Sequence, residues 1–449
     1  MSIKHNSLAE RDLRHVWHPC SQMKDYEDFP MMQIASADGP YLVTTDGKKL
    51  IDAISSWWCK SLGHVHPRIS AAVKKQMNRY EHVIMANTCC EPLVELSEKL
   101  ANLAPGLDRV FYSDNGSTAV EVAIKMSLQY HAQTGAGNRT TFLALENGYH
   151  GETILTLAAG DCELYSSPYA PLMPKIPNIT ELPYVSGSND ADWNKISDDS
   201  WDKIESQLNQ HSETLSGIIF EPILQGAGGM KIYSPDFLKR LRKWSTENGV
   251  HLIADEIMTG FGRTGKMLAC EHAGIVPDFA CLSKGLTGGF TPMAVTLTST
   301  EIYNAFYDDY ATGKAFMHSN TYCGYALGVA AALEALNIYD DENIIANVAE
   351  KSCELRRRME YVASETNALV NIRSIGYMAA ADLVDPRTGA KFASKERTGY
   401  QCYKKAIQLG ALLRPLGDTI YFLPPLNTPD AVLDDLTDIT KKTISAVLG

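Results

Sequence analysis

The sequence predicts an α/β fold, with a large domain built on a mostly parallel central sheet and a smaller α/β domain. The first observation is length, because 449 residues with 45% hydrophobic content can bury the cores of two domains. The second is that helical stretches alternate with short apolar runs between about residues 62 and 321, among them 109–112, 141–144 and 217–220. Strands that alternate with helices are typical of βαβ units and hence of a parallel sheet.

The N-terminal part predicts an arm and a small sheet. Short apolar pieces are separated there by turn signals, and Asp46-Gly47 is a dipeptide typical of a hairpin tip. The polar segment 186–210 predicts a surface connection with one helix rather than a linker between domains. The alanine-rich stretch 328–338 predicts a long helix that leads to the C-terminal domain.

Strand-like segments alternate with helices again in the C-terminal part of the chain. These segments are 371–373, 378–382 and 419–423. We therefore expect three parts: residues 1–61 as the arm and part of the small domain, 62–325 as the large domain, and 326–449 as the C-terminal small domain.

Charge and cysteine content restrict the class of protein. The chain has 41 basic and 53 acidic residues, and the net charge of −12 disfavours binding to nucleic acid or to an anionic membrane. Ten cysteines without a C-x-x-C pair favour reduced structural thiols over a disulfide scaffold or a zinc site. The first ten residues lack the apolar core of a signal peptide, and no apolar stretch reaches membrane-spanning length. We expect a cytoplasmic protein without nucleic-acid or membrane partners.

Two apolar runs end in residues that suit an aldehyde cofactor. The run 250–254 ends in Asp255, and a later apolar stretch ends in Ser283 and Lys284. Pyridoxal phosphate needs a lysine amine to hold its aldehyde as a Schiff base and a carboxylate to keep its ring nitrogen protonated. Singly, such residues are usually a solvated lysine and a turn-forming aspartate. Their shared position after buried strands favours a ligand site, since open parallel sheets bind ligands at the carboxyl ends of their strands.

The residues after two further predicted strands suit a phosphate site and an aromatic ring that could stack on a cofactor. After residues 111–112 a tight turn leads into a helix that starts near Gly116 and Ser117. Free amides at a helix start bind phosphate, and Ser117 adds a hydroxyl donor, although a simple helix cap is the alternative. Tyr149 lies between Gly148 and His150-Gly151 after another strand. Its ring suits stacking on a pyridine ring, and a packed loop is the alternative.

The segment 260–266 matches two nucleotide-binding patterns incompletely. It contains G-x-G-x-x-G, and it fits G-x-x-x-x-G-K-[ST] except at Met267, where the hydroxyl that would hold Mg²⁺ is missing. For a dinucleotide site the glycines should follow a strand directly, but Asp255 and Glu256 intervene. A nucleotide-binding enzyme is therefore the disfavoured alternative, and we expect a glycine-rich loop that presents Arg263.

Three other features have both a functional and a plain structural interpretation. On an extended segment Trp57 and Trp58 would point to opposite sides, so that one is core and the other lines a cavity, unless both are core. Arg414 emerges from apolar sequence and suits bidentate capture of a carboxylate, or else a surface ion pair. His64 and His66 have the spacing of a metal pair without supporting cysteines or acids, so we expect packed histidines and no metal.

Together these residues resemble the class III aminotransferases of pyridoxal-phosphate fold type I over essentially the full chain. The segments that carry the resemblance are Trp17-His18-Pro19, Ser55-Ser56-Trp57-Trp58, Glu221-Pro222 with 225–230, Asp255-Glu256 with 260–266, 283–289, and Arg414-Pro415. Several occur throughout the family. Ser-Ser-Trp-Trp and Arg-Pro favour the members that transaminate 8-amino-7-oxononanoate in biotin biosynthesis.

The resemblance implies pyridoxal 5'-phosphate as cofactor. It implies that Lys284 carries the Schiff base, that Asp255 pairs with the ring nitrogen and that Tyr149 stacks on the ring. Gly116 and Ser117 would hold the phosphate.

The resemblance further implies a homodimer with shared active sites. Thr321 would reach the phosphate in the partner subunit, with Ser319 and Asn320 beside it. Trp57 would line the substrate cavity and Arg414 would bind the carboxylate of the oxononanoate. The implied substrate-binding set is completed by Cys20, Tyr149, Arg263, Lys284, Ser319 and Tyr421.

The chain departs from the pattern of these members at a few positions. Cys20 stands where they carry an aromatic residue, usually Tyr, and Glu152 replaces an Asp. Ser319-Asn320 and Tyr325 also replace the more usual Gly-Pro and Asn. Because Cys20 changes how the amino donor is held, S-adenosylmethionine and lysine both stay open as donors. A class III enzyme for ornithine, 4-aminobutyrate or a diamine is the rival, which Glu152 favours and which the Trp pair and Arg414 disfavour.

Overall fold

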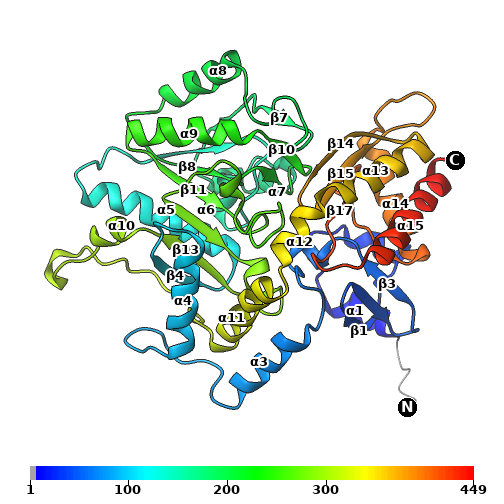
Figure 1. The fold of residues 1–449 in the computed structure, drawn as a ribbon, viewed down its shortest axis with the longest axis horizontal. Coiled ribbons are helices and arrows are strands. Elements are labelled where there is room, and N and C mark those ends of the chain that lie inside the picture. Colours follow the sequence, from blue (N-terminus) through cyan, green and yellow to red (C-terminus); the bar gives the residue numbers. More distant parts are fainter. Residues whose placement is uncertain (1–6) are drawn as a thin grey trace.

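The computed structural model describes residues 7–449, so residues 1–6 of the predicted arm lie outside the described part. Figure 1 shows two bodies. The larger contains β4 (Arg109–Ser113), β8 (Leu215–Phe220), β11 (His251–Asp255) and β13 (Ala294–Thr298), and the smaller contains β14 (Leu369–Ile375), β15 (Met378–Leu383) and β17 (Thr419–Phe422). Helices α11 (Ala326–Asp341) and α12 (Ile344–Glu350) lead from the larger body to the smaller one. The α/β fold class predicted from the sequence is confirmed.

The larger body is built on a seven-stranded sheet. Its strands, in spatial order, are β4 (Arg109–Ser113), β13 (Ala294–Thr298), β12 (Phe279–Leu282), β11 (His251–Asp255), β8 (Leu215–Phe220), β5 (Thr141–Leu145) and β6 (Asn178–Ile179). Strand β13 is antiparallel to both neighbours, and every other pairing is parallel. The prediction of a mostly parallel sheet is therefore confirmed.

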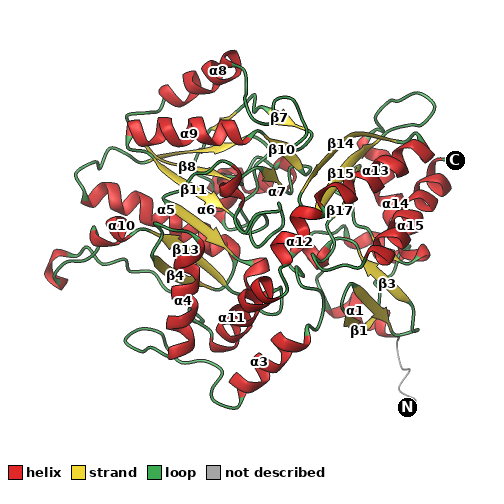
Figure 2. Ribbon diagram, viewed as in Figure 1, coloured by secondary structure: helices red, strands yellow, loops and turns green. Residues whose placement is uncertain are grey.

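Helices cover both faces of this sheet, as Figure 2 shows. Helix α5 (Gly116–Gln133) packs on one face, where Ile253 of β11 joins its apolar cluster. Helix α9 (Pro235–Asn248) packs on the other face, in the cluster that contains Leu252 and Ala254. Successive strand residues point to opposite faces, so a continuous apolar run is what a sheet covered on both faces requires.

The remaining elements of the larger body surround that sheet. Helix α4 (Glu91–Leu103) packs on β4, and α11 packs on α3 (Pro67–Met77) and α4. Strands β7 (Tyr184–Val185), β10 (Lys231–Tyr233) and β9 (Leu224–Gln225) form a small sheet, and the short helices are α6 (Ile154–Ala158), α7 (Glu163–Ser166), α8 (Asp198–Asn209) and α10 (Thr300–Asn304). Helix α8 is the single helix predicted in the polar segment 186–210.

The smaller body joins the two ends of the chain. Strands β1 (Ile34–Asp38), β2 (Tyr41–Thr44) and β3 (Lys49–Asp52) form a sheet with β16 (Ala411–Leu412), which pairs in parallel with β3. The hairpin predicted at Asp46-Gly47 is confirmed between β2 and β3. A second sheet consists of β14 (Leu369–Ile375), β15 (Met378–Leu383) and β17 (Thr419–Phe422), and helices α13 (Ser352–Thr366), α14 (Thr398–Leu409) and α15 (Asp430–Leu448) complete this body. The domain boundaries near residues 62 and 326 stay predictions.

Short helices and turns complete the described chain. They are α1 (Leu8–His15), α2 (Ser55–Trp58) and the 3₁₀ turns η1 (Met23–Glu27), η2 (Ser167–Leu172), η3 (Ala269–His272), η4 (Lys284–Thr287), η5 (Tyr310–Thr312) and η6 (Ser394–Glu396). Within residues 7–449 no helix combines the length and the apolar character needed to cross a membrane. All ten cysteines are free thiols.

Two histidine rings stack inside the larger body near the start of β11. The ring centroids of His131 and His251 lie 4.5 Å apart. Nδ1 of His251 lies 2.9 Å from Oγ of Ser127, and Nε2 of His131 donates to the carbonyl of Ser216 at 3.1 Å. Burial lowers the pKa of His251 to about 4, because a charged imidazole would lose its hydration. Asp278 opposes this shift, whereas His131, Arg242 and Arg139 add to it.

We expect acid to destabilise the fold through His251. Its folded pKa of about 4 lies below the ordinary 6.5, so its contribution to stability is complete above pH 6.5 and is lost as the pH falls toward 4. At pH 5 the loss is about 2 kcal/mol. The variant His251→Gln should therefore lose less melting temperature between pH 7.5 and 5 than the wild type does, measured by circular dichroism. His15→Gln, at an exposed position, is the control, and equal losses in wild type and His251→Gln would contradict the expectation.

Candidate active site

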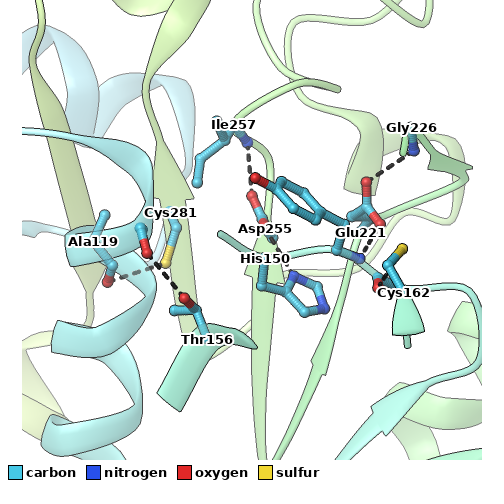
Figure 3. A network of polar contacts seen from close by, with 12 residues as sticks. Ala119, His150, Thr156, Cys162, Glu221, Gly226, Asp255, Ile257 and Cys281 are labelled. Carbon is cyan, nitrogen blue, oxygen red and sulfur yellow. Dashed lines mark hydrogen bonds and ion pairs between the residues drawn. The ribbon is translucent and has the colours of Figure 1, made fainter. Parts of the chain in front are cut away.

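Four neighbouring strands bring chemically active residues to one edge of the large sheet. Asp255 ends β11, Lys284 follows β12, Glu221 follows β8, and Tyr149-His150 follows β5. Figure 3 shows Asp255, His150 and Glu221 together in one polar network. Because these strands are parallel, their carboxyl ends meet at the same edge, where such sheets bind ligands.

Asp255 is buried and held by two hydrogen bonds. Nδ1 of His150 lies 2.9 Å from Oδ2 of Asp255, and the amide of Ile257 donates to Oδ1 at 3.1 Å. Nε2 of His150 is buried without a hydrogen-bond partner, which favours the tautomer that carries its proton on Nδ1 and donates to Asp255. The carboxylate is thus fixed in orientation, and His150 is a site residue that the sequence analysis quoted without assigning it a role.

Lys284 lies at the start of η4 in a left-handed backbone conformation, with φ of 37°. Its Nζ lies 4.7 Å from the centre of the Trp58 ring. Burial lowers the pKa of the amine, while the charges of Asp255 and Glu221 oppose that shift. A lowered pKa increases the neutral fraction of the amine, which is the form that attacks an aldehyde.

The start of helix α5 forms a narrow cradle of small and hydroxyl residues. Asn115 caps the helix by accepting from the amide of Thr118 at 3.1 Å. Oγ of Ser117 lies 2.8 Å from Oγ1 of Thr153 and 2.9 Å from Oγ1 of Thr156. A Cβ on Gly116 would lie 2.7 Å from Cδ1 of Ile257, so a larger residue there would require the Ile257 side chain to move. Close backbone approach and free amides at a helix start suit a phosphate group.

Tyr149 is tied down at both its backbone and its hydroxyl group. Its amide donates to Oε2 of Glu221 at 3.0 Å, and its hydroxyl donates to Oε1 of Glu152 at 3.0 Å. Burial raises the pKa of the Tyr149 phenol, and the Glu152 carboxylate adds to the shift. The ring is therefore fixed and stays protonated at neutral pH.

The Ser-Ser-Trp-Trp segment forms a left-handed turn, so the extended conformation considered for Trp57 and Trp58 is wrong. The φ angles of Ser55, Ser56, Trp57 and Trp58 are 50°, 44°, 71° and 71°. Such angles cost non-glycine residues roughly 1 kcal/mol each, and therefore need support from the surrounding structure. The buried Asp52 provides part of it, by accepting from the amide of Ser56 at 2.9 Å and from its hydroxyl at 2.6 Å.

The turn sends its two tryptophans to different places. Trp58 is buried, and its Nε1 donates to the hydroxyl of Tyr421 at 3.0 Å. Trp57 is 47% exposed, and the Arg414 guanidinium lies 5.1 Å from the centre of its ring. Trp58 is thus buried and Trp57 is half exposed, but both line the cavity, so the two tryptophans are not divided between core and cavity.

A cavity of about 1270 Å³ lies next to these residues. Nη2 of Arg414 donates to the carbonyl of Cys20 at 2.6 Å, and Sγ of Cys20 lies 3.5 Å from the Tyr165 hydroxyl. The cavity is lined mostly by apolar and aromatic side chains with a few charged groups, and the residues that bear on its chemistry are Cys20, Trp57, Trp58, Glu152, Arg414 and Tyr421. Such a mixture is typical of a site for an aliphatic ligand with a charged end.

Arg263 lies elsewhere. It is 3% exposed and is absent from the residues that line the cavity. Its Nη1 donates to the carbonyl of Tyr377 at 3.0 Å and to that of Pro424 at 2.9 Å. Burial lowers its pKa to about 10. The glycine-rich loop therefore turns Arg263 inward, where it ties the loop to the smaller body, and we leave it out of the proposed substrate contacts.

Two other predicted features lie apart from the sheet edge. Ser319 and Thr321 are exposed in the segment that precedes α11, with Asn320 between them. Nε2 of His64 lies 2.8 Å from Oδ2 of Asp52, which places that histidine among the supports of the left-handed turn. Among residues 7–449 no group of three or more His, Cys, Asp or Glu could hold a metal ion.

Comparison with known proteins gives consistent similarities. The family model Aminotransferase class-III matches residues 22–444. The adenosylmethionine-8-amino-7-oxononanoate aminotransferase of Helicobacter pylori is 39% identical, over 95% of this chain and 94% of that protein. The solved structure of the enzyme of that name from Methanocaldococcus jannaschii is 33% identical with a TM-score of 0.90, over 98% of each chain.

Other solved transaminases are similar at lower identity. The omega transaminase of Pseudomonas jessenii, solved in complex with PMP, is 25% identical with a TM-score of 0.90, over 98% of each chain. An amine transaminase from an uncultivated Pseudomonas species, solved in its PLP-bound form, is 29% identical with a TM-score of 0.84, over 97% of this chain and 98% of that one.

Removal of Asp52 should destabilise the left-handed turn. Asp52→Ala deletes the acceptor of both Ser56 hydrogen bonds and the partner of His64, so we expect the free energy of unfolding to fall by about 2–4 kcal/mol. Ser56→Gly deletes the hydroxyl hydrogen bond but keeps the amide hydrogen bond to Asp52, and the loss of Cβ relieves a positive φ, so its loss should be about 1 kcal/mol or less. Denaturant titration measures both values, and equal losses would contradict the support assigned to Asp52.

Proposed function

Because the chain belongs to the class III aminotransferase family, we propose that it transfers an amino group to 8-amino-7-oxononanoate and forms 7,8-diaminononanoate in biotin biosynthesis. The observation that carries this proposal is the similarity, at 34–39% identity over nearly the whole chain, to several aminotransferases named for that substrate. The chain is an aminotransferase, and the proposal concerns its substrates and the roles of its residues.

The residues at the sheet edge fit pyridoxal 5'-phosphate. We assign Lys284 to its aldehyde, Asp255 to its ring nitrogen and Tyr149 to the face of its ring. Gly116 and Ser117 would hold its phosphate, since they begin helix α5 beside the hydroxyl groups of Thr153 and Thr156. When bound, this cofactor withdraws electrons from the donor carbon and stores the amino group between the two half-reactions.

Lys284 and Asp255 divide the proton chemistry between them. Nζ of Lys284, whose pKa is lowered by burial, would take the proton from the α-carbon of the donor and deliver it to the former aldehyde carbon of the cofactor. Asp255 keeps a proton on the ring nitrogen of the ligand, and His150 holds its carboxylate in place at 2.9 Å. The two tasks are thus assigned to different side chains at the same sheet edge.

Arg414 is assigned to the carboxylate of the oxononanoate. Its guanidinium lies against the Trp57 ring, which restricts its motion while leaving donors free beyond the bond to Cys20. Trp57 and Tyr421 line the cavity and would cover the aliphatic chain and exclude water from it. A fixed carboxylate at one end places the reacting carbonyl at the other.

We propose S-adenosylmethionine as the amino donor, in keeping with the names of the relatives, with lysine as the alternative. Cys20 and Glu152 both line the cavity, and Glu152 accepts from Tyr149, so these two residues face the place where donors would differ. We also propose a cytoplasmic homodimer in which Asn320 and Thr321 reach the partner's cofactor and Ser319 its substrate. The exposure of Ser319 and Thr321 supports that assignment.

Single-turnover experiments test the function. The visible band of the Lys284 Schiff base should be present in the cofactor-loaded wild type and absent from Lys284→Ala. Addition of S-adenosylmethionine or lysine should convert the cofactor to its aminated form, and 8-amino-7-oxononanoate should restore the first spectrum. Ornithine is the matched control. Conversion by ornithine alone, without recovery on adding the oxononanoate, would refute the assignment in favour of an ω-amine transaminase.

Substitution of Arg414 should act on the amino acceptor. We expect Arg414→Ala to raise the KM for 8-amino-7-oxononanoate about 100-fold, because a charge-assisted bidentate contact is lost. Arg414→Lys keeps the charge without the planar fork, so its KM should rise about tenfold. Steady-state kinetics and melting temperatures of both variants provide the measurement. An unchanged KM in a folded Arg414→Ala protein would remove Arg414 from the acceptor site.

A further inference from the structure

Glu221 is a buried acid at the sheet edge that the proposed mechanism leaves without a role. It follows β8, which lies between β5 and β11 in the sheet. Its Oε2 accepts from the amide of Tyr149 at 3.0 Å, and its Oε1 accepts from the amide of Gly226 at 2.9 Å. Figure 3 shows Glu221 with Gly226 on one side and Asp255 and His150 on the other. Both carboxylate oxygens are therefore committed to backbone amides.

The surroundings of Glu221 make it costly to keep in place as an anion. Burial raises the pKa of its carboxyl group to about 7, with Asp255 adding to the shift and His150 opposing it. The titratable groups that face it are His150, Cys162, Tyr184, Tyr233, Asp255 and Lys284. An apolar or neutral residue would avoid this cost. We therefore expect the acid at this position to have a role beyond packing.

The Tyr149-His150 dipeptide is held by both acids of the sheet edge. Glu221 holds it through the backbone amide of Tyr149, and Asp255 holds it through Nδ1 of His150. The backbone of Tyr149 is thereby fixed relative to β8, and the His150 ring is fixed relative to β11. Any shift of the Glu221 carboxylate would move Tyr149 relative to Lys284.

Glu256 provides the contrast within the same molecule. It is also buried, and it accepts from the amides of Ala269 and Cys270 at 2.9 Å each and from the Thr259 hydroxyl at 2.6 Å. Those partners belong to η3 and to the turn before it, not to Tyr149. The charges that act on Lys284 are those of Asp255, Glu221 and Cys59, and Glu256 is not among them. Both acids are thus buried and each accepts from two backbone amides, but only Glu221 contacts Tyr149.

We propose that Glu221 is a positioning residue of the active site, which holds the backbone of Tyr149 at the end of β8 by accepting from the amides of Tyr149 and Gly226. This inference rests on the proposed function, in which Tyr149 and Lys284 hold pyridoxal phosphate. We assign Glu221 itself no contact with the cofactor or the substrate. It acts on the cofactor through Tyr149, whose backbone amide donates to it.

Three variants separate the reach of Glu221 from its charge. Glu221→Gln keeps the size, loses the charge and leaves one amide without an acceptor, whereas Glu221→Asp keeps the charge and is too short to reach both amides. Glu256→Gln is the matched control. Two properties of the cofactor-loaded enzyme are measured, in addition to melting temperature. One is the dissociation constant of pyridoxal phosphate, and the other is the pH midpoint of the visible absorption band of the Lys284 Schiff base.

We expect Glu221→Gln and Glu221→Asp both to weaken cofactor binding about tenfold, because each loses an amide contact that holds Tyr149. Only Glu221→Gln should lower the pH midpoint, by about one unit, because removing a nearby negative charge destabilises the protonated Schiff base. Glu256→Gln should change neither property, even if its melting temperature falls.

The outcomes are distinct. If Glu221→Gln matches Glu256→Gln in both properties, the proposal for Glu221 is overturned. If Glu221→Gln does not fold, wild-type cofactor affinity in Glu221→Asp overturns the proposal and tenfold weaker binding supports it. If the wild type itself shows no visible band with pyridoxal phosphate, the proposed function fails instead.

Discussion

The pairing of one buried carboxylate with one buried imidazole organises the active edge of this protein. A carboxyl group buried in a sheet requires hydrogen-bond partners, and Nδ1 of His150 lies 2.9 Å from Oδ2 of Asp255. The contact fixes the loop after β5 to the end of β11, so that Tyr149 and the lysine after β12 come to the same place. The geometry of the site thus follows from the requirement to satisfy a buried charge.

A second constraint acts from the smaller body. Asp52 at the end of β3 supports the turn that carries both tryptophans, while Tyr421 of β17 accepts from Trp58. Arg263 connects the two bodies from the other side, because its side chain extends from the larger body and donates to two carbonyls of the smaller one. The wall of the cavity is therefore a shared product of both bodies, and the relative placement of the two bodies determines its shape.

The sequence was sufficient to predict those parts of the fold and site that depend on local pattern. Asp255 and Lys284 follow continuous apolar runs, and a buried parallel sheet requires such runs, so the strand ends were predictable. The left-handed conformation of Ser55–Trp58 was not, because no glycine marks it and its supports are Asp52, His64 and distant strands. The buried position of the Arg263 side chain was not predictable either, because it depends on two carbonyl groups more than a hundred residues away in the sequence. Glu221 carried a signal, as an acid directly after the apolar run 217–220, and it could have been assigned by the reasoning used for Asp255.

The parallel pairing of β3 with β16 has a consequence for the synthesis of the chain. Residues 49–52 leave the ribosome early, yet the strand that completes their sheet is residues 411–412. At roughly 5–20 residues per second this partner arrives tens of seconds later. During that time the β1–β3 hairpins present an open edge to other nascent chains and to chaperones. The sheet of the smaller body can be completed only after translation is nearly finished, so this part of the protein folds late and through a long-range contact.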